Sequence, residues 1–338
     1  MKKTTFIGIV ILLVCMIVCL VGYNTLVIQE ESQKYQKLQT EAKEPEKETE
    51  KKDNTKETSN TPTIYCIGDS LTIGSSSSSY PTALSSLTGF SVNKFGGATD
   101  KTIDLSIKMG RTEIFTKDIT IPASVEEVPI TIYNSKGEEL DVLTGELGNF
   151  KNVEISGVSG TLNYNSTSQK HTFTRNERGD KVKISSLTQI KASLPEFEDD
   201  SIAIIFTGTY DPNVNNGIFR TITYQRAIIN QLGTEKYIVV SLTSKRKFSI
   251  VRDMNSVLKE EHGDHFLDFR AYLLEHSLED AGITPTDQDK QDLEKGYIPS
   301  SLLKDDVNGN SKFNELLAKQ LIEKMIELDY ISEDQIQN

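Results

Sequence analysis

A serine follows directly on a short apolar run and stands where an α/β protein usually performs chemistry. The run Ile64–Ile67 ends abruptly at Gly68-Asp69-Ser70. Such a run is typical of a buried parallel strand that delivers polar side chains at its carboxyl end. Ligands of open α/β sheets lie outside these ends, so Ser70 is a candidate nucleophile. The alternative is that Asp69 and Ser70 serve only as turn and helix-cap residues.

Three further polar clusters each follow an apolar strand or precede a helix. They are Gly96-Gly97-Ala98-Thr99, Thr207-Gly208-Thr209-Tyr210-Asp211 and Asp305-Asp306-Val307-Asn308. Each cluster also has a plain interpretation. The two glycines can simply form a tight turn. The last cluster, with Asn310, offers side-chain oxygens that suit calcium, but no bidentate glutamate follows at the spacing of an EF-hand loop.

The order of these pieces, from residue 63 to about residue 328, resembles that of the SGNH (GDSL) hydrolases. In this resemblance Ser70 matches the nucleophile, and Gly97 matches the glycine whose backbone N–H serves the oxyanion hole. Asp305 matches the acidic residue of the Asp-x-x-His motif. Asp69 and Asp211 match positions next to the oxyanion and the substrate. The resemblance implies a serine ester hydrolase or O-acyl transferase with a three-layer, flavodoxin-like α/β fold and no cofactor.

Two positions depart from the family pattern, and both would carry chemistry. Asn308 stands where the resemblance expects the general-base histidine, and Tyr210 where it expects the oxyanion-hole asparagine. An asparagine amide has no basic nitrogen, so it cannot take a proton from serine. Loss of the triad histidine lowers turnover on the order of a million-fold. Loss of one oxyanion donor lowers it roughly 100- to 1,000-fold.

These departures leave two functions open. The first is a catalytically impaired SGNH-like protein that acts as a binding or accessory module. The second is an active serine ester hydrolase or O-acyl transferase that acts on cell-envelope glycans or other acyl esters, which the intact Ser70 and Gly97 favour. A nucleotide-binding α/β domain is a third interpretation, but no Gly-x-Gly-x-x-Gly motif follows the first strand.

The four histidines are poor substitutes for the missing base. His262 and His265 flank the start of the last predicted strand, which is the wrong end of the sheet for Ser70. His276 lies in the helix after that strand, and His171 lies in a separate β-rich region. We expect structural or surface roles for all four histidines.

The elements that must position these residues alternate between strands and helices. Strands are predicted at residues 64–67, 90–95, 201–206, 237–242 and 265–269. Helices are predicted at residues 80–87, 101–109 (capped by Asp100), 216–232, 249–261 and 311–328. Five strands that alternate with helices predict a mostly parallel, doubly wound sheet with both faces covered. We assign this SGNH-like domain to residues 63–109 and 191–332.

Between residues 110 and 190 the apolar period changes to two. Short strands are predicted at residues 119–121, 130–133, 153–155, 161–164, 171–173 and 181–184, with Gly-containing turns between them. Several short strands at this spacing indicate a small sandwich or barrel. We therefore predict an all-β domain inserted into the α/β domain.

The N-terminal residues predict a membrane anchor. Residues 6–28 form an apolar run of roughly 20 residues, which is enough to cross a bilayer core. Lys2 and Lys3 precede the run and Glu30-Glu31 follow it, so the N-terminus is expected in the cytoplasm and the remainder outside the cell. No Ala-x-Ala-like cleavage site follows, which favours an uncleaved signal anchor over residues 1–28. Residues 29–62 are polar and charged and predict a disordered stalk.

Charge and cysteine content limit the partners. The net charge of −12 argues against a nucleic-acid partner. Of three cysteines, two lie in the apolar N-terminal run, and Cys66 lies inside the first predicted strand as a small apolar residue. No disulfide framework or Cys/His metal spacing results, so no metal or cofactor is expected. The expected partners are the membrane, through residues 6–28, and an envelope glycan, an acyl ester or a protein.

Overall fold

The computed structural model describes residues 61–336, apart from residues 75–77, 146–149, 193–196, 199, 212–216 and 247. The predicted signal anchor and all but the last two residues of the predicted stalk lie outside the described residues. Across the ranges that are described, no helix has both the length and the apolar composition that crossing a bilayer requires. The described residues belong to one compact unit that spans Ser59–Asn338.

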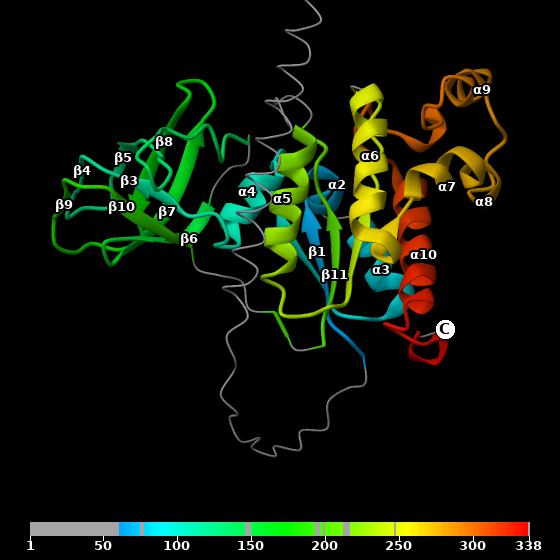
Figure 1. Cartoon of the computed structure of the whole chain (residues 1–338), viewed down its shortest axis with the longest axis horizontal. Helices are drawn as coiled ribbons and strands as arrows, with labels where there is room; N and C mark the ends of the chain where they lie inside the picture. The colour runs from blue at the N-terminus through cyan, green and yellow to red at the C-terminus, as the bar shows by residue number, and fades with distance from the viewer. Residues whose placement is uncertain are drawn as a thin grey trace, which may run out of the picture. The chain divides into compact units, whose positions relative to one another are not determined.

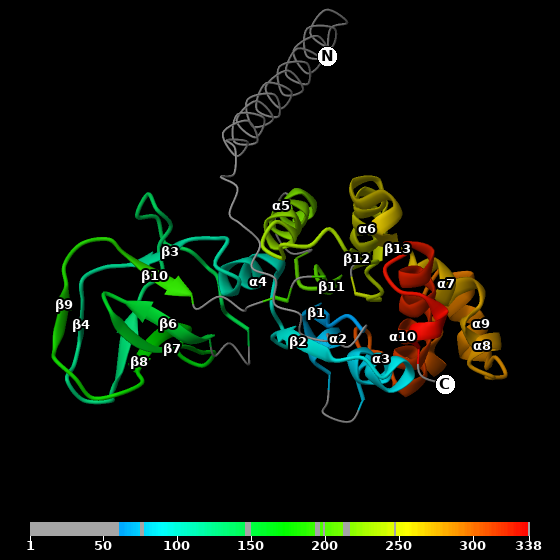
Figure 2. The same ribbon diagram turned by 90° about the horizontal axis from the view of Figure 1, so that it is seen from below.

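A parallel sheet of five strands forms the centre of the described α/β region. Its strands are β1 (Ile64–Gly68), β2 (Val92–Gly96), β11 (Ile202–Phe206), β12 (Tyr237–Val240) and β13 (Phe266–Leu267). They lie in the order β13–β12–β11–β1–β2, and every neighbouring pair is parallel. Figure 1 labels the adjacent strands β1 and β11, and Figure 2 labels all five strands. The prediction of a parallel α/β sheet is confirmed. The strand order reverses between β1 and β11, and ligands of such sheets lie at that reversal.

Helices cover both faces of this sheet. They are α2 (Ser70–Ile73), α3 (Tyr80–Thr88), α4 (Thr102–Lys108), α5 (Gly217–Ile229), α6 (Phe248–His262), α7 (Phe269–Glu275), α8 (Ser277–Asp280), α9 (Asp287–Glu294) and α10 (Ser311–Glu327). Ile202 and Ile204 of β11 pack with α3, α7 and α10, while Ala203 and Ile205 pack with α4, α5 and α6. Successive strand residues point to opposite faces, so the continuous apolar run of β11 needs both covers. Figure 2 shows α5 and α6 on one side of the sheet and α3 and α10 on the other.

The segment between α4 and β11 forms antiparallel sheets of its own. Its strands are β3 (Ile114–Thr116), β4 (Ile119–Ile121), β5 (Glu127–Ile130), β6 (Phe150–Ile155), β7 (Val158–Asn165), β8 (Lys170–Arg175), β9 (Val182–Ile184) and β10 (Thr188–Ala192). Six of them lie in the order β3–β10–β6–β7–β8–β5, and β4 pairs with β9. The first and last strands are neighbours, with Ile114 opposite Ile190, so the two ends of the segment lie close together. Strand β10 runs two residues beyond the predicted boundary at residue 190.

The structure differs from the sequence-based prediction of the α/β region at three points. Asp100 does not cap α4. Lys101 precedes that helix and its backbone N–H donates to Asp104 Oδ2, while Asp100 forms a buried ion pair with Lys108. The predicted last strand is shorter, since α7 begins at Phe269 where the Asp268 side chain accepts from the Ala271 N–H. The helices α8 and α9 and three short 3₁₀ turns occupy stretches without an apolar period: η1 (Gly263–His265), η2 (Ser300–Leu302) and η3 (Glu333–Gln335).

Candidate active site

Ser70 lies at the point where the strand order reverses. Strand β1 ends at Gly68, and Ser70 opens α2 with Asp69 as its N-cap. Gly68 pairs with Gly96 of β2 on one side and with Phe206 of β11 on the other. A Cβ on Gly68 would lie 2.3 Å from the Phe206 carbonyl oxygen, so only glycine allows the strands to approach this closely at the site.

The Ser70 hydroxyl is paired with a tyrosine from the neighbouring strand end. Ser70 Oγ and Tyr210 Oη are 3.0 Å apart, and either oxygen can donate the hydrogen. Tyr210 follows β11, so the pair joins the two strand ends at the reversal. Burial raises the pKa of Tyr210, while the bond to Ser70 opposes the rise. The phenol is therefore neutral at physiological pH and cannot act as a base for Ser70.

Asn308 and Asp305 form a second pair in the loop before α10. The Asn308 side chain donates from Nδ2 to Asp305 Oδ2 at 2.9 Å. The backbone N–H groups of Val307 and Asn308 both donate to Asp305 Oδ1, at 2.8 and 2.9 Å. Partial burial would raise the pKa of Asp305, but these three hydrogen bonds outweigh it and hold the pKa below its ordinary value. Asp305 is thus a stable anion that orients the Asn308 amide.

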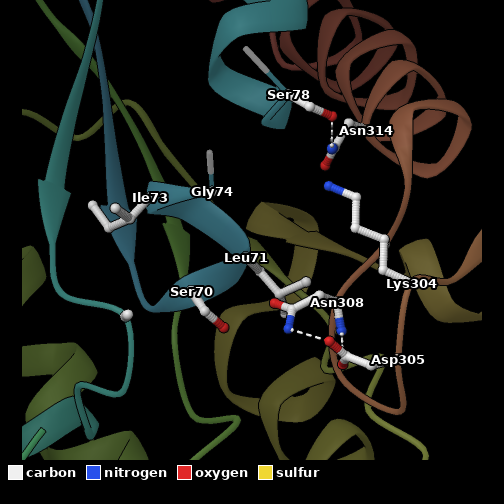
Figure 3. A pocket seen from close by; sticks show the side chains of 11 residues that line it. Ser70, Leu71, Ile73, Gly74, Ser78, Lys304, Asp305, Asn308 and Asn314 are labelled. Atoms are coloured by element: carbon white, nitrogen blue, oxygen red, sulfur yellow. Dashed lines mark hydrogen bonds between the residues drawn. The ribbon is translucent and has the colours of Figure 1, made fainter. Parts of the chain in front are cut away.

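Ser70, Asp305 and Asn308 line one pocket of about 240 Å³ (Figure 3). The other lining residues come from α2 and the following loop, the loop after β2, the loop before α10 and the first turn of α10: Leu71, Ile73, Gly74, Ser78, Ala98, Lys304, Gly309 and Asn314. Within Figure 3, Ser70 and Asn308 face the same opening, and the Asn308 amide nitrogen is turned toward Asp305. The pocket therefore combines a hydroxyl, an amide and an oriented carboxylate but no basic imidazole.

Asp69 is fully buried beside Ser70 and is only half satisfied. Its Oδ1 accepts the Leu71 N–H at 3.1 Å, whereas its Oδ2 has no hydrogen-bond partner among the described residues. The buried Thr209 hydroxyl also has no hydrogen-bond partner among the described residues. It lies close enough to lower the pKa of Asp69 but does not meet the geometry of a hydrogen bond. Burial is the main cause that raises the pKa of Asp69 to about 7. Such perturbed carboxyl groups are enriched at functional sites.

Gly97 and Asp211 lie next to the pocket and do not line it. Gly97 precedes the lining residue Ala98, and a Cβ at Gly97 would lie 2.9 Å from the Asp100 carboxylate. Asp211 is buried and accepts hydrogen bonds from the Thr102 N–H, the Thr102 hydroxyl and the Thr221 hydroxyl. These bonds fix the first turn of α4, and with it the end of the loop that carries Gly97.

The sequence analysis missed four polar residues around the pocket. Lys304, Ser78 and Asn314 line it, and the positive charge of Arg246 acts on both Asp305 and Tyr210. Only the position of Lys304 directly before the Asp-Asp-Val-Asn cluster pointed to a role. Side chains from four separate loops meet here, and apolar periodicity does not predict such meetings.

The calcium interpretation of the Asp305 cluster is not favoured by the geometry. Asp305 uses both carboxylate oxygens within its own loop. Asn310 is the N-cap of α10, and its Oδ1 accepts from the N–H groups of Lys312 and Phe313. No group of three or more His, Cys, Asp or Glu residues suited to a metal ion occurs in the part of the chain that is described.

The histidines also lie away from the pocket. His262 is buried against Gln225, and His265 contacts the Tyr237 carbonyl and the Tyr330 hydroxyl. His171, in the β-rich segment, lies 3.4 Å from the Leu143 carbonyl. No histidine lines the Ser70 pocket as described.

No protein-family model matches the chain, and no curated protein matches it. A solved structure from Desulfitobacterium hafniense DCB-2, proposed to be a lipolytic protein of the G-D-S-L family, matches 78% of this chain and 99% of its own. The sequence identity is 13% and the TM-score is 0.41. The fold assignment accordingly rests on the sheet order and layers described above.

Proposed function

We propose that this chain is a membrane-anchored, extracellular SGNH-like protein in which hydrolysis is impaired and the Ser70 pocket serves as a binding or accessory site. The observation that carries the proposal is the hydrogen bond from Asn308 Nδ2 to Asp305 Oδ2 at 2.9 Å, in the pocket that Ser70 lines. An imidazole oriented by a carboxylate in this way is the general base of a serine triad. Here an amide takes that place.

The chemical consequence follows from what the amide can do. Asn308 can hold Asp305 and offer its carbonyl oxygen to the pocket, but it cannot accept the proton of Ser70. The hydroxyl of Ser70 is bonded instead to Tyr210, a neutral phenol. Ser70 therefore lacks a base, and a serine hydroxyl without a base is a weak nucleophile.

The proposed location rests on the sequence of residues 1–62. Residues 6–28 would anchor the chain in the cell membrane with a cytoplasmic N-terminus, and residues 29–62 would hold the folded part outside. Candidate ligands at that location are an envelope glycan, an acyl ester or a protein. Protease added to intact cells should remove the folded part, and its protection until the cells are lysed would contradict this topology.

An active serine ester hydrolase or O-acyl transferase on envelope glycans is the second candidate. The position of Ser70 favours this second candidate. Ser70 is the first residue of α2, just after the carboxyl end of the central strand β1, and it lines the pocket. In this case the base would come from the substrate or from solvent. The remaining scaffold of a serine hydrolase without its base still gives a rate above that of water.

One experiment separates the two candidates. The initial rate of hydrolysis of a chromogenic acetyl ester is measured for the full chain and for Ser70→Ala. The proposed impairment predicts that both proteins give nearly the same slow rate. A fast rate that Ser70→Ala abolishes would establish the hydrolase and overturn the impairment.

A further inference from the structure

The pocket beside Ser70 contains a cation that no described side chain neutralises. Lys304 lines the pocket, and Figure 3 shows its ammonium group pointing into the opening, toward Ser78 and Asn314. Lys304 is exposed, and its Nζ atom takes part in no hydrogen bond or ion pair with another described residue. The nearest carboxylate along the chain, Asp305, is turned toward Asn308 and already accepts three N–H groups.

The backbone that carries Lys304 is held firmly in place. The Lys304 N–H donates to the Asn308 carbonyl oxygen at 2.8 Å, and Leu303 bridges to Gly309 across the same loop. Within this loop, the Asp305 carboxylate accepts hydrogen bonds from the N–H groups of Val307 and Asn308. The backbone position from which the Lys304 side chain extends along the pocket wall is therefore fixed.

Further positive charge surrounds the same opening. Lys94 donates to the carbonyl oxygen of Ile73, a lining residue, at 3.1 Å. Arg246 lies close enough to help lower the pKa of Asp305 and to oppose the rise that burial causes in the pKa of Tyr210. Neither Lys94 nor Arg246 lines the pocket, so both charges act on it from behind the lining residues. The lining itself carries one cation, Lys304, and one anion, Asp305. Three N–H groups already donate to the Asp305 carboxylate, so Lys304 is the lining charge that is left to attract a ligand.

The wall opposite Lys304 supplies neutral donors. Asn314, in the first turn of α10, donates to the Ser78 hydroxyl over a long distance of 3.4 Å. A bond of that length is weak, and both groups can turn to a ligand at little loss. A carboxylate placed between Lys304 and this pair would receive a charge-assisted hydrogen bond from the ammonium group and neutral ones from the amide and the hydroxyl.

We propose that the Ser70 pocket selects ligands that carry a carboxylate, which Lys304 binds while the ester or hydroxyl end of the ligand lies against Ser70. This inference rests on the proposed function of the pocket as a ligand site, and it specifies the charge of that ligand. The volume of about 240 Å³ is below the roughly 300–1,000 Å³ of sites for drug-sized ligands, so a small acid or one acidic end of a larger molecule fits.

The test compares two probes that differ in one charge. Monomethyl succinate carries a methyl ester and a carboxylate, whereas dimethyl succinate carries two esters and no charge. Binding to the full chain in detergent micelles is followed by saturation-transfer NMR, with affinities from titration. We expect monomethyl succinate to bind about tenfold more tightly than dimethyl succinate, which corresponds to roughly 1.4 kcal/mol, and the preference to weaken as salt is added.

Variants assign the effect to Lys304. Lys304→Ala should abolish the preference for the acid, and Lys304→Arg should retain most of it. Lys312→Ala is the matched control, because Lys312 is an exposed lysine on α10 that pairs with Glu315 and does not line the pocket. The control should bind monomethyl succinate as the unaltered chain does.

Each outcome has a distinct meaning. Equal binding of the two probes, an unchanged preference in Lys304→Ala, or no binding of either probe would overturn the anion selectivity. The same spectra report methanol released from the ester. Rapid release that requires Ser70 would overturn the proposed impairment and leave the selectivity standing.

Discussion

The chemistry of this pocket depends on what each polar side chain contacts. Ser70 contacts Tyr210, a neutral acid, and Asn308 contacts Asp305, an oriented anion. Either contact alone would fit an enzyme. Together they support the proposed impairment, because neither contact gives the serine hydroxyl a base.

Restoring a base should restore catalysis. In Asn308→His, an imidazole Nδ1–H can take over the hydrogen bond to Asp305 that the Asn308 amide makes at 2.9 Å. We expect the initial rate on a chromogenic acetyl ester to rise roughly 100-fold or more. Adding Tyr210→Asn should raise the rate further by supplying an oxyanion donor, although the two gains need not multiply.

The control for this gain is Ser70→Ala in each background, which should return the rate to that of the unaltered chain. Asn308→Gln changes the side chain without adding a base and should leave the rate low. If Asn308→His gives no serine-dependent gain while remaining folded, Asn308 does not occupy the position of the base.

Asp69 should oppose stability at neutral pH. Its folded pKa is about 7 against an ordinary value of 3.8, so the folded state binds more protons between these values and stability falls as pH rises through them. Asp69→Asn keeps the acceptor for the Leu71 N–H and adds a donor near the Thr209 hydroxyl. Urea unfolding should show the variant more stable by on the order of 2–4 kcal/mol at pH 8, with the gap closing near pH 4.

Asp305→Asn provides the contrast, because hydrogen bonds lower the pKa of Asp305 against the effect of its partial burial. This substitution should reduce stability at neutral pH, and the loss should shrink as the pH approaches the pKa of the carboxyl group. A pH-independent gap for Asp69→Asn would mean that the Asp69 charge does not destabilise the fold.

At the scale of elements, a buried polar chain joins α6 to the site. His262 on α6 bonds to the Gln225 Oε1 atom on α5 at 3.0 Å, and Gln225 donates to the Thr207 carbonyl at the end of β11. The Thr207 hydroxyl pairs with Thr102 at the start of α4, which in turn bonds to Asp211. Because an amide oxygen only accepts, the Nε2 atom of His262 carries a proton in this bond. Burial lowers the pKa of His262, so the ring is neutral at neutral pH.

Acid should therefore weaken this layer of helices. Burial lowers the pKa of His262 to about 4, so between pH 6.5 and pH 4 the unfolded state binds a proton that the folded state rejects. The contribution of neutral His262 to the free energy of unfolding is complete above pH 6.5 and is lost as the pH falls to about 4. Relative to His262→Gln, the unaltered chain should lose on the order of 3 kcal/mol over this range in urea unfolding. His276→Gln, at an exposed site, should show no such difference.

The strands of the parallel sheet and the long helices could be predicted because burial leaves an apolar pattern in their sequences. In the β-rich segment, β3 and β10 were not predicted, and the strand predicted at residues 130–133 is β5 at Glu127–Ile130. β11 is apolar at all five positions and every one is buried, and α10 shows one apolar face. The helix α9 has no such pattern, since the Thr286 and Asp289 side chains and backbones cap its first turn and its residues are mostly charged. The positions of Ser70 and Asn308 in one pocket depend on four loops, and a sequence contains no local signal for their meeting.

At the scale of the whole molecule, the β-rich segment is attached to the α/β region in two ways. Its ends leave and return through the neighbouring strands β3 and β10. Its core also includes Ile103 and Ile107 of α4, and the Leu143 N–H donates to Asp104 on the same helix at 2.6 Å. Burial raises the pKa of Asp104 to about 6, so this contact lies in a dry environment. The segment thus supports the helix whose first turn Asp211 fixes beside the site.

Removing the segment tests how much of the fold depends on it. Residues 113–191 are replaced by a short Gly/Ser linker, which keeps the end of α4, where Gly110 takes a positive φ and the Arg111 N–H donates to the Ser106 carbonyl. The α/β region should still unfold cooperatively by circular dichroism but at a lower temperature. The reason is that Ile103 and Ile107 become exposed, and the burial of each side chain contributes at most roughly 1.5–3 kcal/mol to the free energy of unfolding.

A second variant distinguishes two effects of the deletion: exposure of the apolar surface of α4, and loss of a segment that the α/β region needs in order to fold. Replacing Ile103 and Ile107 by polar residues in the shortened chain removes the exposed apolar surface, so it should reduce aggregation and leave the sheet intact. The same substitutions in the full chain should destabilise it, because both side chains are buried there. If neither shortened variant unfolds cooperatively, the β-rich segment is part of the folding unit itself, and the α/β sheet cannot form around Ser70 without it.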